Sequence, residues 1–158
     1  MDPDVSDDAS SRARSIVAEL GVSENVRLAE ELVSEALGLI ADQPDTLDLK
    51  IATAALTEMR DAYAMFGPYQ DRRKVAIFGS ARTPEDHPDY KQAHKFAEMI
   101  RQAGWMVITG AGDGIMKAGH GGAGADASFG VAIALPFEQR TNSVIEGDKK
   151  LVNFKYFF

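Results

Sequence analysis

A short glycine-rich segment, Gly110-Ala-Gly-Asp-Gly114, holds the residues whose spacing most clearly suggests a binding site. Gly110, Gly112 and Gly114 can adopt positive φ and let backbone amides approach a ligand closely. A helix that begins directly after such a loop adds unpaired N–H groups and the positive end of its dipole. This combination favours the binding of a phosphate or another anion. A tight turn between a strand and a helix would need the same glycines, so the loop alone leaves both interpretations open.

The spacing of these glycines argues against two common nucleotide motifs. Ile115 occupies the last glycine position of the dinucleotide fingerprint G-x-G-x-x-G. No Gly-Lys-Ser or Gly-Lys-Thr follows the loop, as a P-loop would require. Dinucleotides and nucleoside triphosphates therefore lose support as ligands.

A second glycine-containing segment, Phe78-Gly-Ser-Ala-Arg82, adds polar side chains to the candidate site. Ser80 offers a hydroxyl to a phosphate or a ribose, and Arg82 offers a planar fork that suits phosphate or carboxylate. A surface salt bridge is the alternative role for Arg82. The residues predicted to bind a nucleotide or its phosphate are Gly79, Ser80, Arg82, Gly110, Gly112 and Gly114.

These two segments lie in the second half of the chain, where short apolar runs alternate with helical patterns. The apolar runs predict three strands near residues 74–79, 105–110 and 130–135. Helices are expected between them, one starting at Pro88 and one over about residues 114–126. Apolar strands separated by helices predict a parallel sheet covered on both faces, in the βαβαβ order of a mononucleotide-binding half. Both glycine segments should then face the same crevice at the carboxyl ends of the strands.

The predicted fold class is α/β, with an incomplete Rossmann-like parallel sheet of three strands preceded by an α-helical N-terminal extension. Residues 1–10 carry four aspartates and little to bury, so a disordered acidic tail is expected. Residues 11–68 form the helical region and residues 69–158 the Rossmann-like half. Helices are expected at residues 11–20, 23–42 and 46–66. Their apolar stripes predict packing against each other, the neighbouring domain or a second subunit, with a ligand groove as the alternative.

Metal and thiol chemistry find little support in the sequence. The chain has no cysteine, which excludes disulfides and thiolate metal sites. His87 and His94 lack the spacing of metal ligands, and His120 lies within the glycine-rich helix, where a structural or exposed role is expected. We therefore expect no metal and no cofactor.

The charge of the chain bears on its partners and its location. A net charge of −7 argues against nonspecific binding to nucleic acid, which needs clustered Lys and Arg. The basic run Asp71-Arg-Arg-Lys74 is interpreted as the solvated flank of a strand. There is no signal-peptide pattern and no run near the ~18 apolar residues that a membrane helix needs. A soluble, cytoplasmic protein without a membrane partner is expected.

Three runs resemble, in order, the successive motifs of the lonely guy (LOG) family, whose members were often labelled lysine decarboxylases. They are Lys74-Val-Ala-Ile-Phe-Gly-Ser-Ala-Arg82, Val107-Ile-Thr-Gly-Ala-Gly-Asp-Gly-Ile-Met116 and Leu135-Pro-Phe-Glu-Gln139. The resemblance covers about Asp45 to the end and is closest to longer bacterial members with a helical extension. It implies a homodimeric Rossmann-type enzyme that hydrolyses the N-glycosidic bond of AMP-like or cytokinin nucleoside 5′-monophosphates. The expected partners are therefore a nucleoside monophosphate or ribose 5-phosphate and a second copy of the chain.

The family's hallmark block, P-G-G-x-G-T-x-x-E, has no counterpart in the chain, because no Pro-Gly-Gly occurs anywhere. The resemblance implies that this block and its glutamate would come after Phe158, so no catalytic residue is assigned and the chain alone is expected to be inactive. Asp113 stands where related sequences often have proline. Three functions stay open: a phosphoribohydrolase lacking its catalytic segment, a non-catalytic nucleotide sensor, and a helical protein with a vestigial sheet.

The chain ends in an unusually apolar run, Phe154-Lys-Tyr-Phe-Phe158. These residues are expected to begin a helix that would pack under further strands. Without those strands, we expect an unpaired sheet edge, an uncovered face, marginal stability and self-association.

Overall fold

The computed structural model describes residues 3–134 and 141–156. The chain divides into two compact units, Met1–Lys50 and Ile51–Phe158, which we call the N-terminal unit and the sheet unit. The boundary falls inside a helix, whereas the sequence predicted a change of domain between residues 68 and 69. The run Leu135–Gln139, which carries the third LOG-like motif, lies outside the described residues.

Two helices make up most of the N-terminal unit, α1 (Pro3–Glu19) and α2 (Val26–Ala41). Ala9, Ala13 and Val17 recur every four residues on α1 and are buried, which explains the close pairing of the two helices. The helix α1 begins at Pro3, so it includes most of the segment predicted to be a disordered tail. In the described part of this helix, Asp8 pairs with Arg12 one turn later at 2.9 Å.

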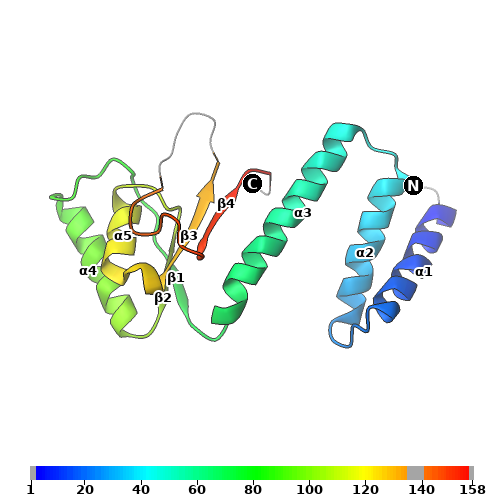
Figure 1. Ribbon diagram of the computed structural model, residues 1–158, viewed down its shortest axis with the longest axis horizontal. Helices are drawn as coiled ribbons and strands as arrows, with labels where there is room; N and C mark the ends of the chain where they lie inside the picture. The colour runs from blue at the N-terminus through cyan, green and yellow to red at the C-terminus, as the bar shows by residue number, and fades with distance from the viewer. Residues whose placement is uncertain (1–2, 135–140, 157–158) are drawn as a thin grey trace. The chain divides into compact units, whose positions relative to one another are not determined.

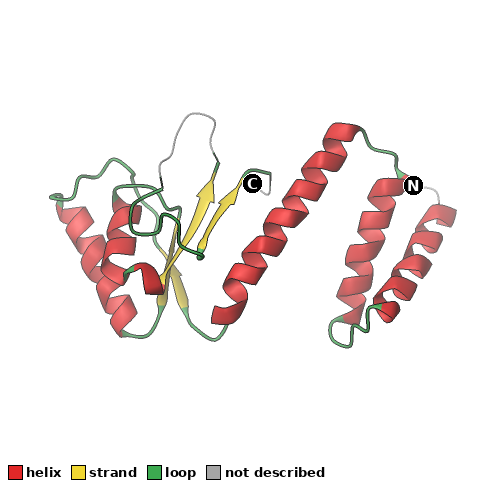
Figure 2. Cartoon of the chain, viewed as in Figure 1, coloured by secondary structure: helices red, strands yellow, loops and turns green. Residues whose placement is uncertain are grey.

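A four-stranded parallel sheet forms the centre of the sheet unit (Figure 2). Its strands are β1 (Lys74–Ala76), β2 (Met106–Thr109), β3 (Ser128–Ile133) and β4 (Leu151–Phe154), in the spatial order β1-β2-β3-β4. Register pairs are Lys74 with Met106, Val107 with Ser128, and Gly130 with Leu151. The predicted α/β class and the three predicted parallel strands are confirmed.

The fourth strand corrects the prediction for the C-terminal residues. Phe154 and the residues before it continue the sheet as β4, whereas a helix was expected to start there. The pairing with β3 explains the difference, because a Cβ on Gly130 would lie 2.6 Å from Leu151 Cδ1. The missing side chain of Gly130 thus makes room for Leu151.

Two helices cover one face of the sheet, α4 (Pro88–Gln102) and α5 (Ile115–Ala123), as Figure 1 shows. A Cβ on Gly122 would lie 2.0 Å from the carbonyl oxygen of His94, so the glycine allows α5 to press directly on α4. Beneath them the core consists of buried apolar residues: Ile77, Ala97, Val107, Ala123 and Ala127. A 3₁₀ turn, Ala125–Ala127, leads from α5 into β3.

The long helix α3 (Thr46–Phe66) lies on the other side of the sheet over its later part (Figure 1). The Phe66 ring lies 4.6 Å from the ring of Phe129 on β3, and Tyr69, in the 3₁₀ turn Gly67–Tyr69, lies 5.2 Å from it. The carboxylate of Glu58 accepts the backbone N–H groups of Lys155 and Tyr156. These contacts make the end of α3 part of the sheet unit. None of the helices within the described residues is long and apolar enough to cross a membrane.

Candidate functional site

The two glycine segments meet at the carboxyl ends of β1 and β2. A Cβ on Gly114 would lie 2.2 Å from the carbonyl oxygen of Ser80, and a Cβ on Gly79 would lie 2.6 Å from Ile115 Cβ. The backbone N–H of Ile115 donates to the Ser80 carbonyl at 3.1 Å. The structure therefore brings the Phe78–Arg82 and Gly110–Gly114 loops into direct contact, and two of the predicted glycines are the residues that allow it.

This contact also determines which amides of α5 an anion could meet. The N–H of Ile115 is already bonded to Ser80, and Ala118 is the first residue to donate back to Gly114 within the helix. Met116 and Lys117 lie in the first turn, where backbone N–H groups have no intrahelical acceptor. An anion at this helix would therefore meet their amides together with those of the glycine loop.

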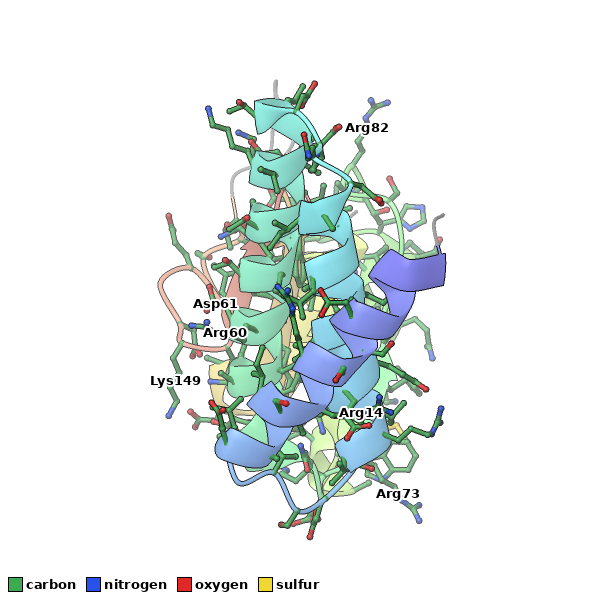
Figure 3. The ribbon with its side chains drawn as sticks, turned by 90° about the vertical axis from the view of Figure 1, so that its right-hand side faces the viewer. Arg14, Arg60, Asp61, Arg73, Arg82 and Lys149 are labelled. Carbon is green, nitrogen blue, oxygen red and sulfur yellow. The ribbon has the colours of Figure 1, made fainter. Side chains whose placement is uncertain are left out.

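The polar side chains of the first loop lie at its exposed side. Ser80 Oγ accepts the backbone N–H of Arg82 at 3.1 Å, which makes a local turn. The Arg82 side chain extends away from the ribbon, at the end of the sheet toward which the strands point (Figure 3). Among residues 3–134 and 141–156 no ion pair involves Arg82, so the surface salt bridge considered for it is not observed there.

The glycine loop itself has a left-handed residue that is not glycine. Ala111 has φ 62° and is buried, a conformation that costs a non-glycine residue about 1–3 kcal/mol. Thr109 Oγ1 accepts the N–H of Ala111 at 2.9 Å. On the other side of the residue, the backbone N–H of Asn142 donates to the Ala111 carbonyl at 2.8 Å. The surrounding structure thus holds Ala111 in this conformation.

A buried polar network lies behind the loop, formed by Thr109, His120 and Asn142. His120 Nε2 lies 3.0 Å from Thr109 Oγ1 and 3.1 Å from the Phe129 carbonyl oxygen. A carbonyl can only accept, so Nε2 carries the hydrogen of that bond, and Nδ1, which lies 3.1 Å from Asn142 Nδ2, is the unprotonated nitrogen of the neutral ring. Burial lowers the pKa of His120, and the bonds to Phe129 and Asn142 oppose that shift. His120 is thus buried and hydrogen-bonded, which agrees with a structural position and not with the exposed one that was the alternative.

Asn142, like Thr109, was not among the site residues predicted from the sequence. Its Nδ2 donates to the carbonyls of Ala111 and Gly112, each at 2.9 Å, and its Oδ1 accepts the N–H of Val144 at 3.2 Å. Thirty residues separate Asn142 from Gly112 along the chain. A single asparagine at that separation has no local pattern that would indicate its role.

A charged cluster lies beside the start of α5 and was also missed. Lys117 Nζ donates to Glu85 Oε1 at 2.7 Å, and this hydrogen bond raises the pKa of Lys117. Burial, followed by the nearby carboxylate of Glu85, raises the pKa of Tyr90. Asp113, in the glycine loop, is exposed. Within residues 3–134 and 141–156, the Glu85 carboxylate is thus ion-paired and the Asp113 carboxylate is open to solvent.

Two open hollows lie along α4. One, of about 460 Å³, is formed by the end of β1 and by α4, and its lining residues are Ala76, Ile77, Phe78, Asp89, Gln92, Ala93 and Phe96. The other, of about 360 Å³, is lined by Glu85, Tyr90, Lys91 and His94. Phe78 is the one lining residue that belongs to either glycine segment. Within the described part of the chain, no group of three His, Asp or Glu side chains could hold a metal ion.

Comparison with known families adds one finding. The profile of the SLOG cluster4 family matches residues 72–152, about half of the chain, from the start of β1 into β4. Both glycine loops and Asn142 lie inside the matched segment. No curated protein matches the sequence.

Proposed function

The chain belongs to the SLOG cluster4 family, within a superfamily related to LOG, and we propose on this basis that its sheet unit is a nucleotide-binding module. The observation that carries the proposal is the direct contact of two glycine loops at the start of α5. Backbone amides at such a point stabilise an anion without a lysine or metal, because the helix dipole and the N–H groups act together.

The ligand that we propose is a nucleoside 5′-monophosphate or ribose 5-phosphate. Its phosphate would bind at Gly79, Ser80, Gly110, Gly112 and Gly114, and Arg82, which forms no ion pair with the other described residues, would turn toward it. Arg82 carries a planar, permanently charged fork that can make two parallel bonds to a phosphate. Lys117, in the first turn of α5, adds a second cation near the same place.

Binding is favoured over hydrolysis for this chain. Breaking an N-glycosidic bond passes through an oxocarbenium-like state, which needs a placed carboxylate. Of the described carboxylates near the loops, Glu85 is paired with Lys117 and Asp113 is exposed. We therefore propose a binding module, and keep the phosphoribohydrolase activity of LOG proteins as the second candidate, because the three LOG-like motifs occur in order.

Calorimetric titration with AMP and with ribose 5-phosphate tests the proposal. The protein should bind both, and Gly112→Val should abolish binding by filling the space that the phosphate needs. Gly38→Ala is a matched control, because a Cβ there meets nothing within 4 Å. Equal affinity in Gly112→Val and wild type would remove this loop from the site.

Chromatographic detection of free adenine distinguishes the two candidates. The binding module should release no base from AMP above background. Turnover near the ~10 per second typical of enzymes would establish hydrolysis and show that the catalytic group had been overlooked.

A further inference from the structure

We propose that Asn142 is the positioning residue of the nucleotide site. Its side chain holds the glycine loop so that two backbone N–H groups of the loop, those of Gly112 and Asp113, face away from the core. This inference rests on the proposed function of the loops. Asn142 lies in the connection between β3 and β4 and is almost completely buried, at 2% exposure.

The geometry of the peptide bond explains how Asn142 orients the loop. In a trans peptide the C=O and the following N–H point in opposite directions, and the described chain has no cis peptide bond. The carbonyls of Ala111 and Gly112 both point at Asn142, whose Nδ2 donates to each at 2.9 Å. The N–H groups of Gly112 and Asp113 must therefore point the other way.

Successive amides that face the same side of a loop form a concave site for an anion. The loop needs an external clamp for this, since Ala111 is held at φ 62°. Asn142 supplies three bonds to it, two from Nδ2 and one from its own backbone N–H to Ala111. A residue far along the chain thus fixes the direction of the amides that would meet the phosphate.

Asn142→Asp is the most specific variant. It keeps the shape of the side chain and the oxygen that accepts the Val144 N–H, but it replaces the donor Nδ2 with a second oxygen. Two carbonyls then face a carboxylate, and the amides lose their fixed direction. Once protonated, the acid can donate one hydrogen bond again. Among the described residues, the titratable group in contact with this position is His120, in the neighbouring helix α5.

The experiment is a calorimetric titration of AMP into wild type, Asn142→Asp and Asn142→Leu between about pH 5 and about pH 8. Asn153→Asp is the control for the added charge, because Asn153 is exposed on β4. Circular dichroism of each variant gives the folded fraction at each pH. The phosphate of AMP also changes its protonation over this pH range. Because this change affects every protein equally, it cancels in the ratio of variant to wild-type affinity at each pH.

At about pH 8, Asn142→Asp and Asn142→Leu should each bind AMP at least roughly tenfold more weakly than wild type, while Asn153→Asp binds normally. Toward pH 5 the affinity of Asn142→Asp should recover, and that of Asn142→Leu should not. Folded Asn142→Asp with wild-type affinity at every pH would overturn the role of Asn142. Absence of binding by wild type itself would instead overturn the proposed function.

If a variant does not fold, the proposal is tested on the wild-type protein instead, by following its amide chemical shifts during a titration with inorganic phosphate. Inorganic phosphate should shift the Gly112 and Asp113 resonances more than those of Gly38 or Gly67. Equal shifts at all four would contradict the proposed direction of the loop amides.

Discussion

At the level of single residues, close backbone contacts determine which residues the two loops can contain. Gly114 has φ 61°, and a Cβ added to it would lie 2.2 Å from the Ser80 carbonyl oxygen. No other residue therefore fits at this position unless the neighbouring backbone moves. Ala111 shows the reverse case, in which a non-glycine residue adopts positive φ because Thr109 and Asn142 hold it. The sequence indicated the glycines, but it could not indicate their partners, which depend on how distant segments pack.

Gly114→Ala should destabilise the sheet unit. The substitution places a side chain at φ 61°, which costs about 1–3 kcal/mol, and forces Ser80 to move. Gly38→Ala, in the interior of α2 with open space around it, should instead stabilise by about 0.8–1 kcal/mol. Urea denaturation measures both changes, and equal stability of Gly114→Ala and wild type would contradict the described contact.

Because of His120, the free energy of unfolding should depend on pH below 6.5, the ordinary pKa of histidine. Burial lowers its folded-state pKa below 6.5, so the unfolded chain binds a proton that the folded one does not. The unfolding free energy should therefore fall as pH drops through 6.5, by at most ~1.4 kcal/mol per pH unit, until the lower folded-state pKa is reached. Comparison with His120→Asn isolates this contribution, and an identical pH profile in the two proteins would argue against a neutral, buried His120.

Among the helices and strands, the sequence predicted those whose position follows from a local pattern of apolar residues or from a helix-starting proline. The apolar runs at β1, β2 and β3 and the proline at the start of α4 indicated those elements and the parallel sheet that they form. Two features escaped prediction because they depend on context. The strand β4 forms by pairing with β3 beside Gly130, and the helix α1 begins at Pro3, within the segment that was expected to be disordered.

The aromatic contact between α3 and the sheet provides a test at this scale. Phe66→Ala removes a partly buried ring that packs at 4.6 Å on Phe129, and should lower the unfolding free energy by about 2–3 kcal/mol. Tyr63→Ala changes an exposed ring on the same helix and should have an effect within about 0.5 kcal/mol. Similar melting temperatures for Phe66→Ala and Tyr63→Ala would show that this part of α3 does not stabilise the sheet.

At the scale of the whole molecule, apolar surface remains exposed on several elements. Leu28, Leu32 and Ile40 on α2 are more than half exposed, and so is Phe78 at the end of β1. Apolar patches and free sheet edges promote association, whereas a net charge of −7 opposes it. The strand β4 extends the sheet beyond the three strands expected, and α3 contacts the sheet through Phe66 and the residues after β4 through Glu58.

We still expect the chain to self-associate, in keeping with the homodimer that its LOG-like motifs imply. Light scattering coupled to size-exclusion chromatography should give a mass above that of one 17.1 kDa chain. Replacing Leu32 and Ile40 with glutamate should shift that mass toward the monomer if α2 takes part. A monomer with a cooperative melt above ~65 °C would refute both the association and the marginal stability.

If the two glycine loops bind the phosphate of a nucleotide, amide NMR during a titration with AMP will detect the contact at individual residues. We expect the largest chemical shift changes at Gly79–Arg82 and Gly110–Lys117, with α1 and α2 unaffected. Saturable changes confined to other elements, or no change at millimolar AMP, would contradict it.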